Sequence, residues 1–191
     1  MPDLPTTGRW TPELSERAGE LRWLLLDVDG VLTDGRLWFG EQGEVLKPFD
    51  VRDGLGIQLL RQNGVDVGIL SARMSPTVAA RAAGLGIDEV LQGEADKEAA
   101  FVAFLERRGV AAGQVAYLAD DLQDLRVLGR CGLSAAPADA VAEVRSRVRY
   151  VTAAAGGRGA VRELAERILS ARGDWQAILA AYSGEVETAD S

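Results

Sequence analysis

The sequence predicts an α/β protein built on a doubly wound, mostly parallel sheet of Rossmann-like type. Two observations predict this class: apolar runs of strand length recur along the chain, and segments with helical spacing of apolar residues alternate with them. A pair of short apolar stretches around a glycine-containing turn breaks the alternation and predicts an inserted β-hairpin. At 191 residues, the chain is long enough to bury the core of one domain.

The chain is expected to enter the sheet with a strand at residues 23–28. This run is apolar nearly throughout, which is typical of a strand covered on both faces. Before it, residues 1–10 are expected to form a loose arm. Thr11 followed by Pro12 predicts the start of a short helix that runs to about Glu20.

The hairpin is expected next, over residues 36–49, with its turn at residues 40–43. We therefore expect three parts. An arm and short helix occupy residues 1–20, the folded domain occupies residues 21–172, and a variable tail occupies residues 173–191.

Beyond the hairpin, helices and strands are expected to alternate in a regular order. Glycines that follow helical segments, such as Gly64, Gly84 and Gly109, are expected to end them. The expected helices span residues 55–62, 75–84, 96–108, 122–128, 138–145 and 159–171, and the expected strands span residues 65–70, 89–91, 115–118 and 133–136.

The composition excludes several function classes. A formal charge of -8 argues against nucleic acid or an anionic membrane as the main partner. The chain has no histidine, which removes histidine-based catalysis and histidine-ligated zinc. Cys131 is the only cysteine, so no intramolecular disulfide forms. With no signal-peptide pattern and no apolar run of membrane-spanning length, a cytoplasmic protein is expected.

Polar side chains gather where the expected strands end. Because ligands of open α/β sheets bind at the carboxyl ends of the strands, we expect these side chains to share one crevice. In chain order they are Asp27 and Asp29, then Ser71 and Arg73, then Lys97, and finally Asp120, Asp121 and Asp124.

Each of these groups alone has a plain structural interpretation. An Asp-x-Asp-Gly segment is most often a turn, Ser71 could cap a turn, and Lys97 could be a solvated charge. The acids from Asp120 onward could simply favour a helix N-terminus. Together, however, clustered carboxylates raise one another's pKa unless a cation offsets them. Mg²⁺ suits this set because it binds few carboxylates and keeps waters for a phosphate oxygen.

The segments DVDGVLTDG, SAR, Lys97 and ADDLQD together resemble the four signatures of the haloacid-dehalogenase superfamily of phosphotransferases. The resemblance implies that Asp27 attacks phosphorus and forms an aspartyl-phosphate, while Asp29 acts as general acid and then base. It also implies the following supporting roles: Mg²⁺ held by Asp27, the Asp29 carbonyl and Asp120; phosphate held by Ser71 and Lys97; and Lys97 and the metal's waters oriented by Asp124 and Asp121. Gly30 would let the backbone approach the phosphate.

A narrower resemblance covers residues 20–172. The hairpin, FDVRDGLGI, LQGEADK and GGRGAVREL are similar to the 3-deoxy-D-manno-octulosonate 8-phosphate phosphatases. That family implies a protein without a cap domain, a homotetramer, and a step of lipopolysaccharide biosynthesis. The hairpin and the glycine-rich segment would close active sites between subunits. Trp38 and Phe39 would then be exposed at an interface, although folding back onto their own sheet is an equal alternative.

Matching positions identify the candidate substrate-binding residues. Arginine suits a carboxylate-bearing substrate because its fork pairs with a carboxylate bidentately. Arg81 could equally be a surface charge, and Arg158 and Arg162 could reach an anion in a neighbouring site. The candidates are Asp29, Asp50, Val51, Arg52, Asp53, Gly54, Gln58, Arg73, Arg81 and Lys97.

Two positions depart from the family pattern: Ala119 replaces a usual glycine, and Gln58 stands where relatives often carry arginine. The predicted function is hydrolysis of octulosonate 8-phosphate with Mg²⁺. The alternative is a nonulosonate 9-phosphate phosphatase on the same scaffold. A phospho-receiver domain is a remote alternative, because there the acidic pair belongs to the first strand and the acceptor aspartate to a middle one.

Overall fold

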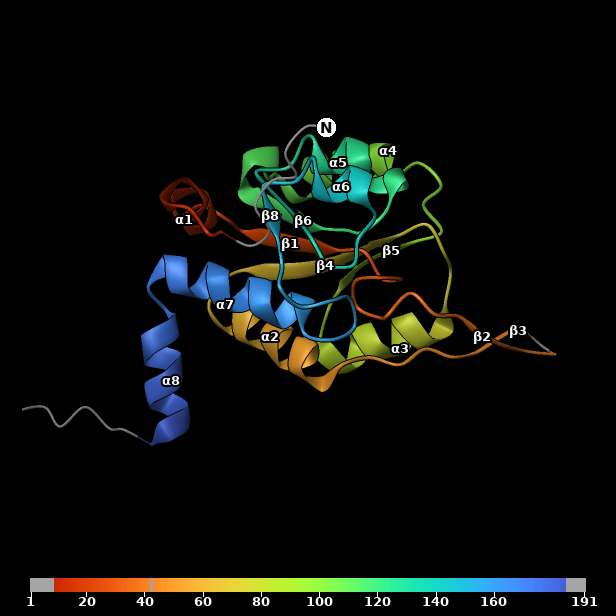
Figure 1. Ribbon diagram of the computed structural model, residues 1–191, viewed down its shortest axis with the longest axis horizontal. Coiled ribbons are helices and arrows are strands. Elements are labelled where there is room, and N and C mark those ends of the chain that lie inside the picture. Colours follow the sequence, from red (N-terminus) through yellow and green to blue (C-terminus); the bar gives the residue numbers. More distant parts are fainter. Residues whose placement is uncertain (1–8, 42, 185–191) are drawn as a thin grey trace, which may run out of the picture.

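Six parallel strands form the centre of the structure, a computed structural model that describes residues 9–41 and 43–184 (Figure 1). The strand order is β5-β4-β1-β6-β7-β8, so the first strand lies in the interior of the sheet. This confirms the predicted doubly wound α/β fold. The strands are β1 (Trp23–Leu26), β4 (Asp66–Ser71), β5 (Glu89–Gln92), β6 (Val115–Leu118), β7 (Leu133–Ala136) and β8 (Tyr150–Val151).

The continuous apolar run of β1 is explained by burial on both faces. Leu24 and Leu26 point into one core cluster, whereas Trp23 and Leu25 point into the other. Both neighbours are parallel, with Leu26 opposite Ile69 of β4 and Leu118 of β6. A strand with no solvated face has no place for alternating polar residues.

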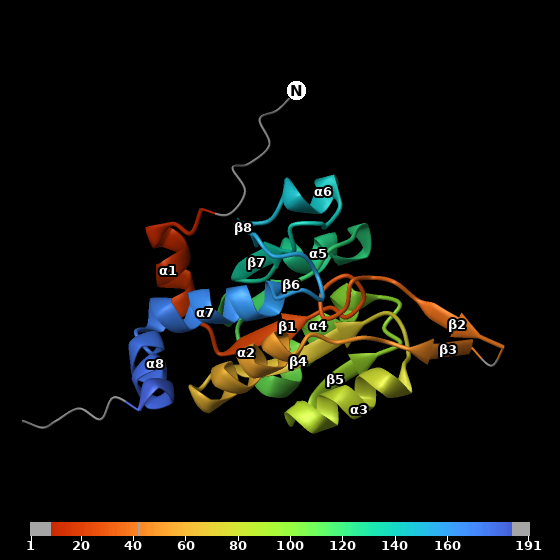
Figure 2. The ribbon, with the colours of Figure 1, turned by 60° about the horizontal axis from the view of Figure 1, so that its bottom comes forward.

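Helices cover the sheet on both sides (Figures 1 and 2). The helices on one face are α1 (Pro12–Gly19), α2 (Val51–Gln62), α3 (Pro76–Leu85) and α7 (Ala160–Arg172). The other face carries α4 (Lys97–Arg108), the 3₁₀ turns η1 (Ala112–Gln114) and η2 (Leu122–Asp124), α5 (Leu125–Leu128) and α6 (Ala142–Arg145). A last helix, α8 (Trp175–Ser183), follows α7.

The predicted hairpin is present as β2 (Trp38–Gly40) and β3 (Gly43–Leu46), an antiparallel pair outside the main sheet. It projects beyond the end of the helix layers (Figure 2). Trp38 is 53% and Phe39 62% exposed, so within this chain they do not fold back onto the sheet. Gln42 of the expected turn lies outside the described residues. Within the described residues, the hairpin is the only separate sheet, and no cap domain is present.

Three helix predictions were wrong at one end. The helix predicted from Leu55 already begins at Val51, after the Asp50 cap. The helix predicted to stop at Gly84 runs on to Leu85 and ends at Gly86, which has the left-handed φ of 70° that such a stop requires. The helix predicted from Ala138 starts only at Ala142, because residues 137–140 form a turn in which the Ala140 N–H donates to the Pro137 carbonyl at 3.1 Å.

Three features were missed. The strand β8 has only two residues, too few to produce a recognisable pattern. The segment predicted as a tail contains α8, in which Ile178 is buried. Trp10 belongs to no loose arm, since its ring packs edge-on against Tyr150 with centroids 5.1 Å apart. Residues 1–8 and 185–191 lie outside the described part of the chain.

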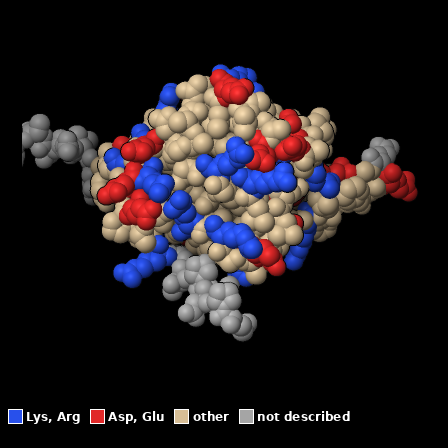
Figure 3. Space-filling view, turned by 90° about the horizontal axis from the view of Figure 1, so that it is seen from above, with Lys and Arg blue, Asp and Glu red and all other residues tan. Residues whose placement is uncertain are grey.

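The surface charge is uneven despite the net charge of -8. On the face that carries α4, α5 and α6, arginines gather between patches of acidic side chains (Figure 3). Arg126 and Arg130 both pair with Glu98 there, at 3.5 and 2.6 Å. No helix in the described residues is long and apolar enough to cross a membrane.

Asp53 joins the start of α2 to the start of α7. Its side chain is 1% exposed and accepts the backbone N–H groups of Arg162 at 2.8 Å and Gly159 at 3.3 Å. It therefore caps the N-terminus of α7, where backbone N–H groups lack partners within the helix. Gly56 allows the two helices to approach, because a Cβ there would lie 3.0 Å from the Arg162 Cα.

Asp53→Ala should lower the free energy of unfolding by about 2 kcal/mol, because it removes the cap and leaves two N–H groups without partners. Urea denaturation followed by circular dichroism measures the change. Asp88→Ala, at an exposed carboxylate before β5, is the matched control and should stay near wild type. Equal stability of the two variants would contradict the capping role.

Candidate active site

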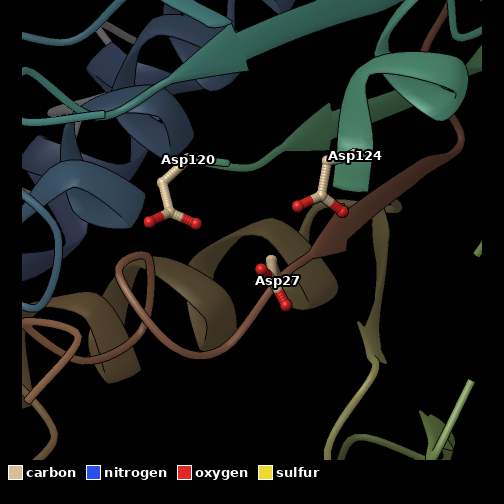
Figure 4. A group of neighbouring side chains, drawn as sticks. All are labelled: Asp27, Asp120 and Asp124. Atoms are coloured by element: carbon tan, nitrogen blue, oxygen red, sulfur yellow. The ribbon is translucent and has the colours of Figure 1, made fainter. Parts of the chain in front are cut away.

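Three carboxylates converge beyond the carboxyl ends of β1 and β6. Asp27 follows β1, Asp120 follows β6, and Asp124 ends the 3₁₀ turn η2. Their side chains point toward a common space (Figure 4). One oxygen from each lies within 4.8 Å of the others, and Asp27 is only 3% exposed. The structure therefore brings together three of the side chains that were predicted to share one crevice.

Lys97 lies among these carboxylates as the first residue of α4. Its ammonium group is 3.0 Å from Asp27 Oδ1 and donates to Asp124 Oδ1 at 2.7 Å. The side chain is 1% exposed, so it is not the solvated charge that its helical position allowed. Although burial acts in the opposite sense, the two carboxylates raise the pKa of Lys97 above its ordinary value.

Tyr117 is a member of the site that the sequence analysis missed. It is fully buried in β6, its hydroxyl donates to Asp124 Oδ1, and the Lys97 ammonium lies 3.5 Å from the same hydroxyl. Burial, together with the charges of Asp124 and Asp27, raises its pKa well above the ordinary value. Its position two residues before Ala119 in an apolar strand carried no signal of this contact.

The carboxylates carry unfavourable charge in this arrangement. Burial, with the nearby charge of Asp124, raises the pKa of Asp27 to about 7. Burial and the charge of Asp27 raise the pKa of Asp120 to about 7 as well. One ammonium group therefore does not fully compensate three carboxylates.

These residues fit a hard divalent cation. Asp124 Oδ2 is buried and has no hydrogen-bond partner among the described residues. Carboxylate oxygens are the ligands that Mg²⁺ prefers, and a bound cation would reverse the unfavourable pKa shifts. Gly30 keeps the space open, because a Cβ at that position would lie 2.0 Å from Asp120 Oδ2.

The loop after β1 is held by the glycine-rich segment before α7. The Gly157 N–H donates to the Val31 carbonyl at 2.8 Å. A Cβ at Gly156 would lie 1.8 Å from the Gly30 carbonyl oxygen, and one at Gly157 would lie 2.4 Å from the Thr33 carbonyl carbon. Only glycine permits this backbone contact, so the segment supports the loop that carries the aspartates.

Asp29 faces a second group of charges. Lys47, which directly follows β3 of the hairpin, pairs with Asp29 Oδ1, and Arg73 Nε lies 3.4 Å from Asp29 Oδ2. Glu44 lies beside both cations, 3.3 Å from the Lys47 ammonium and 3.4 Å from Arg73 Nη2. Ser71, buried at the end of β4, accepts the Arg73 N–H at 3.3 Å. Arg73 and Ser71 were predicted, whereas Lys47 and Glu44 were missed.

One signal could have identified Lys47. The sequence contains only two lysines, Lys47 and Lys97, among many arginines. Both are buried against aspartates of the DVDG segment. Because Lys97 was already a candidate, the only other lysine could have indicated that the hairpin contributes a residue to the site.

Residues 50–54, which match the family motif, mainly form the start of α2. Asp50 caps the helix and pairs with Arg52 at 2.7 Å, and this hydrogen bond lowers the pKa of Asp50. Arg52 also donates to the Arg158 carbonyl at 3.1 Å. Val51 is 78% exposed, and Asp53 is buried as the cap of α7. The structure does not bring Asp53 to the acidic cluster, because both its oxygens bind the start of α7.

Arg81 and Gln58 lie on the helices beside this segment. The Arg81 guanidinium stacks 5.8 Å from the centroid of the Phe49 ring. A Cβ at Gly54 would lie 2.4 Å from it, so this glycine makes room for the guanidinium. Gln58 is exposed and lines a surface pocket with Arg61 and other residues, none of which belongs to the acidic cluster.

Three more predicted residues have contacts within the chain. The Asp121 carboxylate accepts the Leu122 N–H at 2.7 Å as the cap of η2, and it is not part of the acidic cluster. Arg158 lies 3.7 Å from Asp34 and is exposed. Arg162 pairs with Glu166 at 2.6 Å, and its guanidinium lies 5.6 Å from the centroid of the Trp175 ring, so α7 and α8 hold it.

Comparison with known proteins finds octulosonate phosphatases that match most of the chain. No family model matches the chain. The 3-deoxy-D-manno-octulosonate 8-phosphate phosphatase KdsC of Salmonella typhimurium is 45% identical over 166 residues, which cover 87% of this chain and 88% of that protein. The phosphatase structure from Yersinia pestis has a TM-score of 0.84 at 42% identity, covering 86% of this chain and 89% of that one.

A structure from Moraxella catarrhalis adds bound ligands to the comparison. It is a 3-deoxy-D-manno-octulosonate 8-phosphate phosphatase in complex with magnesium, phosphate and the sugar acid. Its TM-score with this chain is 0.88 at 35% identity, and the alignment covers 91% of this chain and 99% of that one.

The raised carboxylate pKa values predict pH-dependent binding of Mg²⁺. Protons must leave Asp27 and Asp120 before a cation binds, so affinity should rise about tenfold for each of these carboxylates between about pH 6 and pH 8. The protein without a cation should lose stability as the pH rises from about 4 through 7. A carboxyl group whose pKa is higher in the folded than in the unfolded protein favours folding while it is protonated, and this contribution is lost as it ionises. Calorimetric titration with Mg²⁺ and thermal denaturation measure the two effects. A pH-independent affinity would contradict the prediction, and Asp120→Asn should bind weakly throughout.

Proposed function

The chain belongs to the 3-deoxy-D-manno-octulosonate 8-phosphate phosphatases of the haloacid-dehalogenase superfamily, and we propose that it hydrolyses octulosonate 8-phosphate to the free sugar acid and phosphate with Mg²⁺ as cofactor. The observation that carries the proposal is the convergence of Asp27, Asp120 and Asp124 around Lys97 at the ends of the strands. Phosphoryl transfer needs positioning and charge neutralisation above all, and this site offers both.

In the proposed reaction, Asp27 is the nucleophile. One of its carboxylate oxygens forms a bond to phosphorus as the bond from phosphorus to the sugar oxygen breaks, and Asp29 gives its proton to that oxygen. Water then attacks the aspartyl-phosphate, Asp29 takes a proton from it, and the bond between phosphorus and Asp27 breaks. Both aspartates are recovered, and phosphate is released.

Lys97 and the acidic cluster would prepare Asp27 for this step. The ammonium group fixes one Asp27 oxygen and offsets its charge, which leaves the other oxygen for phosphorus. Asp124 and Tyr117 hold Lys97 in place. Asp27, Asp120 and the carbonyl of Asp29 would hold Mg²⁺, with Asp124 Oδ2 as a further acceptor beside it. When bound there, the cation neutralises charge on the phosphate oxygens.

We assign the remaining candidates to the substrate. Ser71 is buried at the end of β4, where its hydroxyl can donate to a phosphate oxygen. Arg73 and Arg81 would bind the anionic sugar acid, and Gly54 supports Arg81 sterically. Gln58 has the weakest support, because it lies outside the cluster. The nonulosonate alternative depended on that position and has no support from the relatives.

Phosphate release from octulosonate 8-phosphate should require Mg²⁺ and should stop when EDTA removes it, because the carboxylates alone leave the phosphate charge uncompensated. Initial rates measured by phosphate release, with a nonulosonate 9-phosphate in parallel, test both the reaction and the sugar. We expect kcat/KM to favour the octulosonate ester by at least about tenfold. A preference for the nonulosonate, or no release from either, would contradict the proposal.

Asp27→Asn tests whether Asp27 is the nucleophile. The amide keeps the size of the side chain and removes the nucleophile, so phosphate release should be lost while the circular dichroism spectrum is kept. Retained activity in this variant would overturn the assignment of Asp27.

We also propose a homotetramer in which the hairpin meets a neighbouring subunit. The support is the run of apolar side chains that the hairpin exposes, since such patches mark interfaces. They are Leu37, Trp38, Phe39, Val45 and Leu46, each at least 41% exposed. A cytoplasmic location and a role in lipopolysaccharide synthesis are further proposals, which follow from the composition and the family resemblance.

Light scattering should give a mass about four times the 20.3 kDa of the chain. Phe39→Ser should shift the protein toward smaller species, because it places a polar group in the apolar contact. Leu179→Ser, at an exposed apolar residue of α8, is the matched control and should leave the mass unchanged. A monomeric wild type would rule out the tetramer.

A further inference from the structure

Asp29 is held at both of its carboxylate oxygens by cations from outside β1. Lys47 pairs with Oδ1, and Arg73 Nε lies 3.4 Å from Oδ2. The two cations differ in burial: the Lys47 side chain is 1% exposed, whereas the Arg73 side chain is 44% exposed. Solvent screens the arginine contact more, so Lys47 supplies the stronger constraint on Asp29.

Lys47 is itself fixed by its neighbours. Glu44, in β3 three residues before Lys47, lies 3.3 Å from the ammonium group. Glu44 in turn accepts the Ser75 hydroxyl at 2.7 Å and lies 3.4 Å from Arg73. Although burial acts in the opposite sense, the hydrogen bond from Ser75 and the charge of Lys47 lower the pKa of Glu44, so it stays ionised. The hairpin is thereby fastened to the loop between β4 and α3.

The choice of lysine at this position is chemically selective. Nearly every other cation of the chain is an arginine, and the one other lysine, Lys97, holds Asp27. A compact ammonium fits between two carboxylates where a planar guanidinium needs more room. A buried ammonium is costly unless it is paired, and both partners of Lys47 in the described chain are carboxylates that face the site.

We propose that Lys47, anchored by Glu44, is a positioning residue that fixes the Asp29 carboxylate for proton transfer to and from the leaving oxygen. The inference rests on the proposed function, in which Asp29 is the acid and base. Lys47 does not need to contact the substrate for this role. It acts by binding Oδ1, which leaves Oδ2 to carry the proton and directs it at the oxygen that leaves phosphorus.

The test compares leaving groups, because the position of Asp29 matters only where a proton is required. Benzyl phosphate and p-nitrophenyl phosphate are similar in size and lack the sugar acid, but the benzyl alkoxide needs a proton and p-nitrophenolate does not. Lys47→Met should lower kcat/KM about 100-fold for benzyl phosphate and less than about threefold for p-nitrophenyl phosphate. For octulosonate 8-phosphate, the loss should fall on kcat, with KM changed less than about threefold.

Other outcomes would overturn the proposal. Equal losses for the two esters would mean that Lys47 only supports the structure. A rise in KM for the octulosonate ester with kcat unchanged would mean that it binds the sugar. Activity within about twofold of wild type on all three substrates would mean that Asp29 is held without it.

Three variants complete the test. Glu44→Gln keeps Lys47 but weakens its anchor, so it should show the same contrast between esters in smaller degree; if Lys47→Met fails to fold, the absence of a contrast in Glu44→Gln overturns the proposal. Lys47→Arg keeps the charge, but its guanidinium needs more room than the ammonium, so it should recover only part of the lost kcat. Arg36→Met removes a 73% exposed cation of the same hairpin that does not touch Asp29, and should show no contrast.

The two proposals fail in different ways. If the wild-type protein releases no phosphate from octulosonate 8-phosphate, the proposed substrate is wrong, and the ester contrast still reports on Lys47. If the wild type hydrolyses that substrate and Lys47→Met shows no contrast, only the role of Lys47 is wrong.

Discussion

A single buried ammonium group allows the edge of this sheet to carry clustered carboxylates. Lys97 lies between Asp27 and Asp124 and binds both, although its position at the N-terminus of α4 is unfavourable for a cation. The two carboxylates offset that cost, and the ammonium offsets part of their repulsion, so neither side of the contact would be stable at this burial without the other. The strand order serves this contact, because β1 and β6 are adjacent and parallel and deliver their acids to the same end. The charge that remains is what a divalent cation would neutralise.

The catalytic loop depends equally on parts of the chain that are distant in sequence. Its backbone touches the glycine-rich segment directly, with no side chain between Gly156 and the Gly30 carbonyl. That segment leads into α7, whose first turn is capped by Asp53 of α2. The motif at residues 50–54 therefore contributes to the site through the backbone it stabilises. A family motif can keep its residues for such a supporting contact, which resemblance alone does not reveal.

The sequence predicted those features of the site that depend on neighbouring residues in the chain. Aspartates after an apolar strand, a serine after the next and a lysine at a helix start are visible because strand ends are visible, and parallel strands bring their ends together. Lys47 and Tyr117 could not be placed in this way, since their contacts depend on how the hairpin packs and on which face of β6 meets η2. Asp53 was assigned to the substrate from its match to the family motif, because the sequence does not show that its partner N–H groups lie at the start of α7. The error at Gly84 arose because a glycine ends a helix only where its own backbone turns left-handed, as Gly86 does.

Two charge networks meet at the segment that joins Asp27 to Asp29. The inner network, with Lys97 and Asp124, lies at the end of the main sheet, and both side chains are buried. The outer network, with Lys47 and Glu44, lies on the hairpin, which pairs with no strand of the main sheet. The nucleophile is therefore held by groups of the main fold, whereas the Asp29 carboxylate is also held by a projecting segment. That same segment exposes Trp38 and Phe39, so in the proposed tetramer the subunit contact and the contact that holds Asp29 lie on one hairpin.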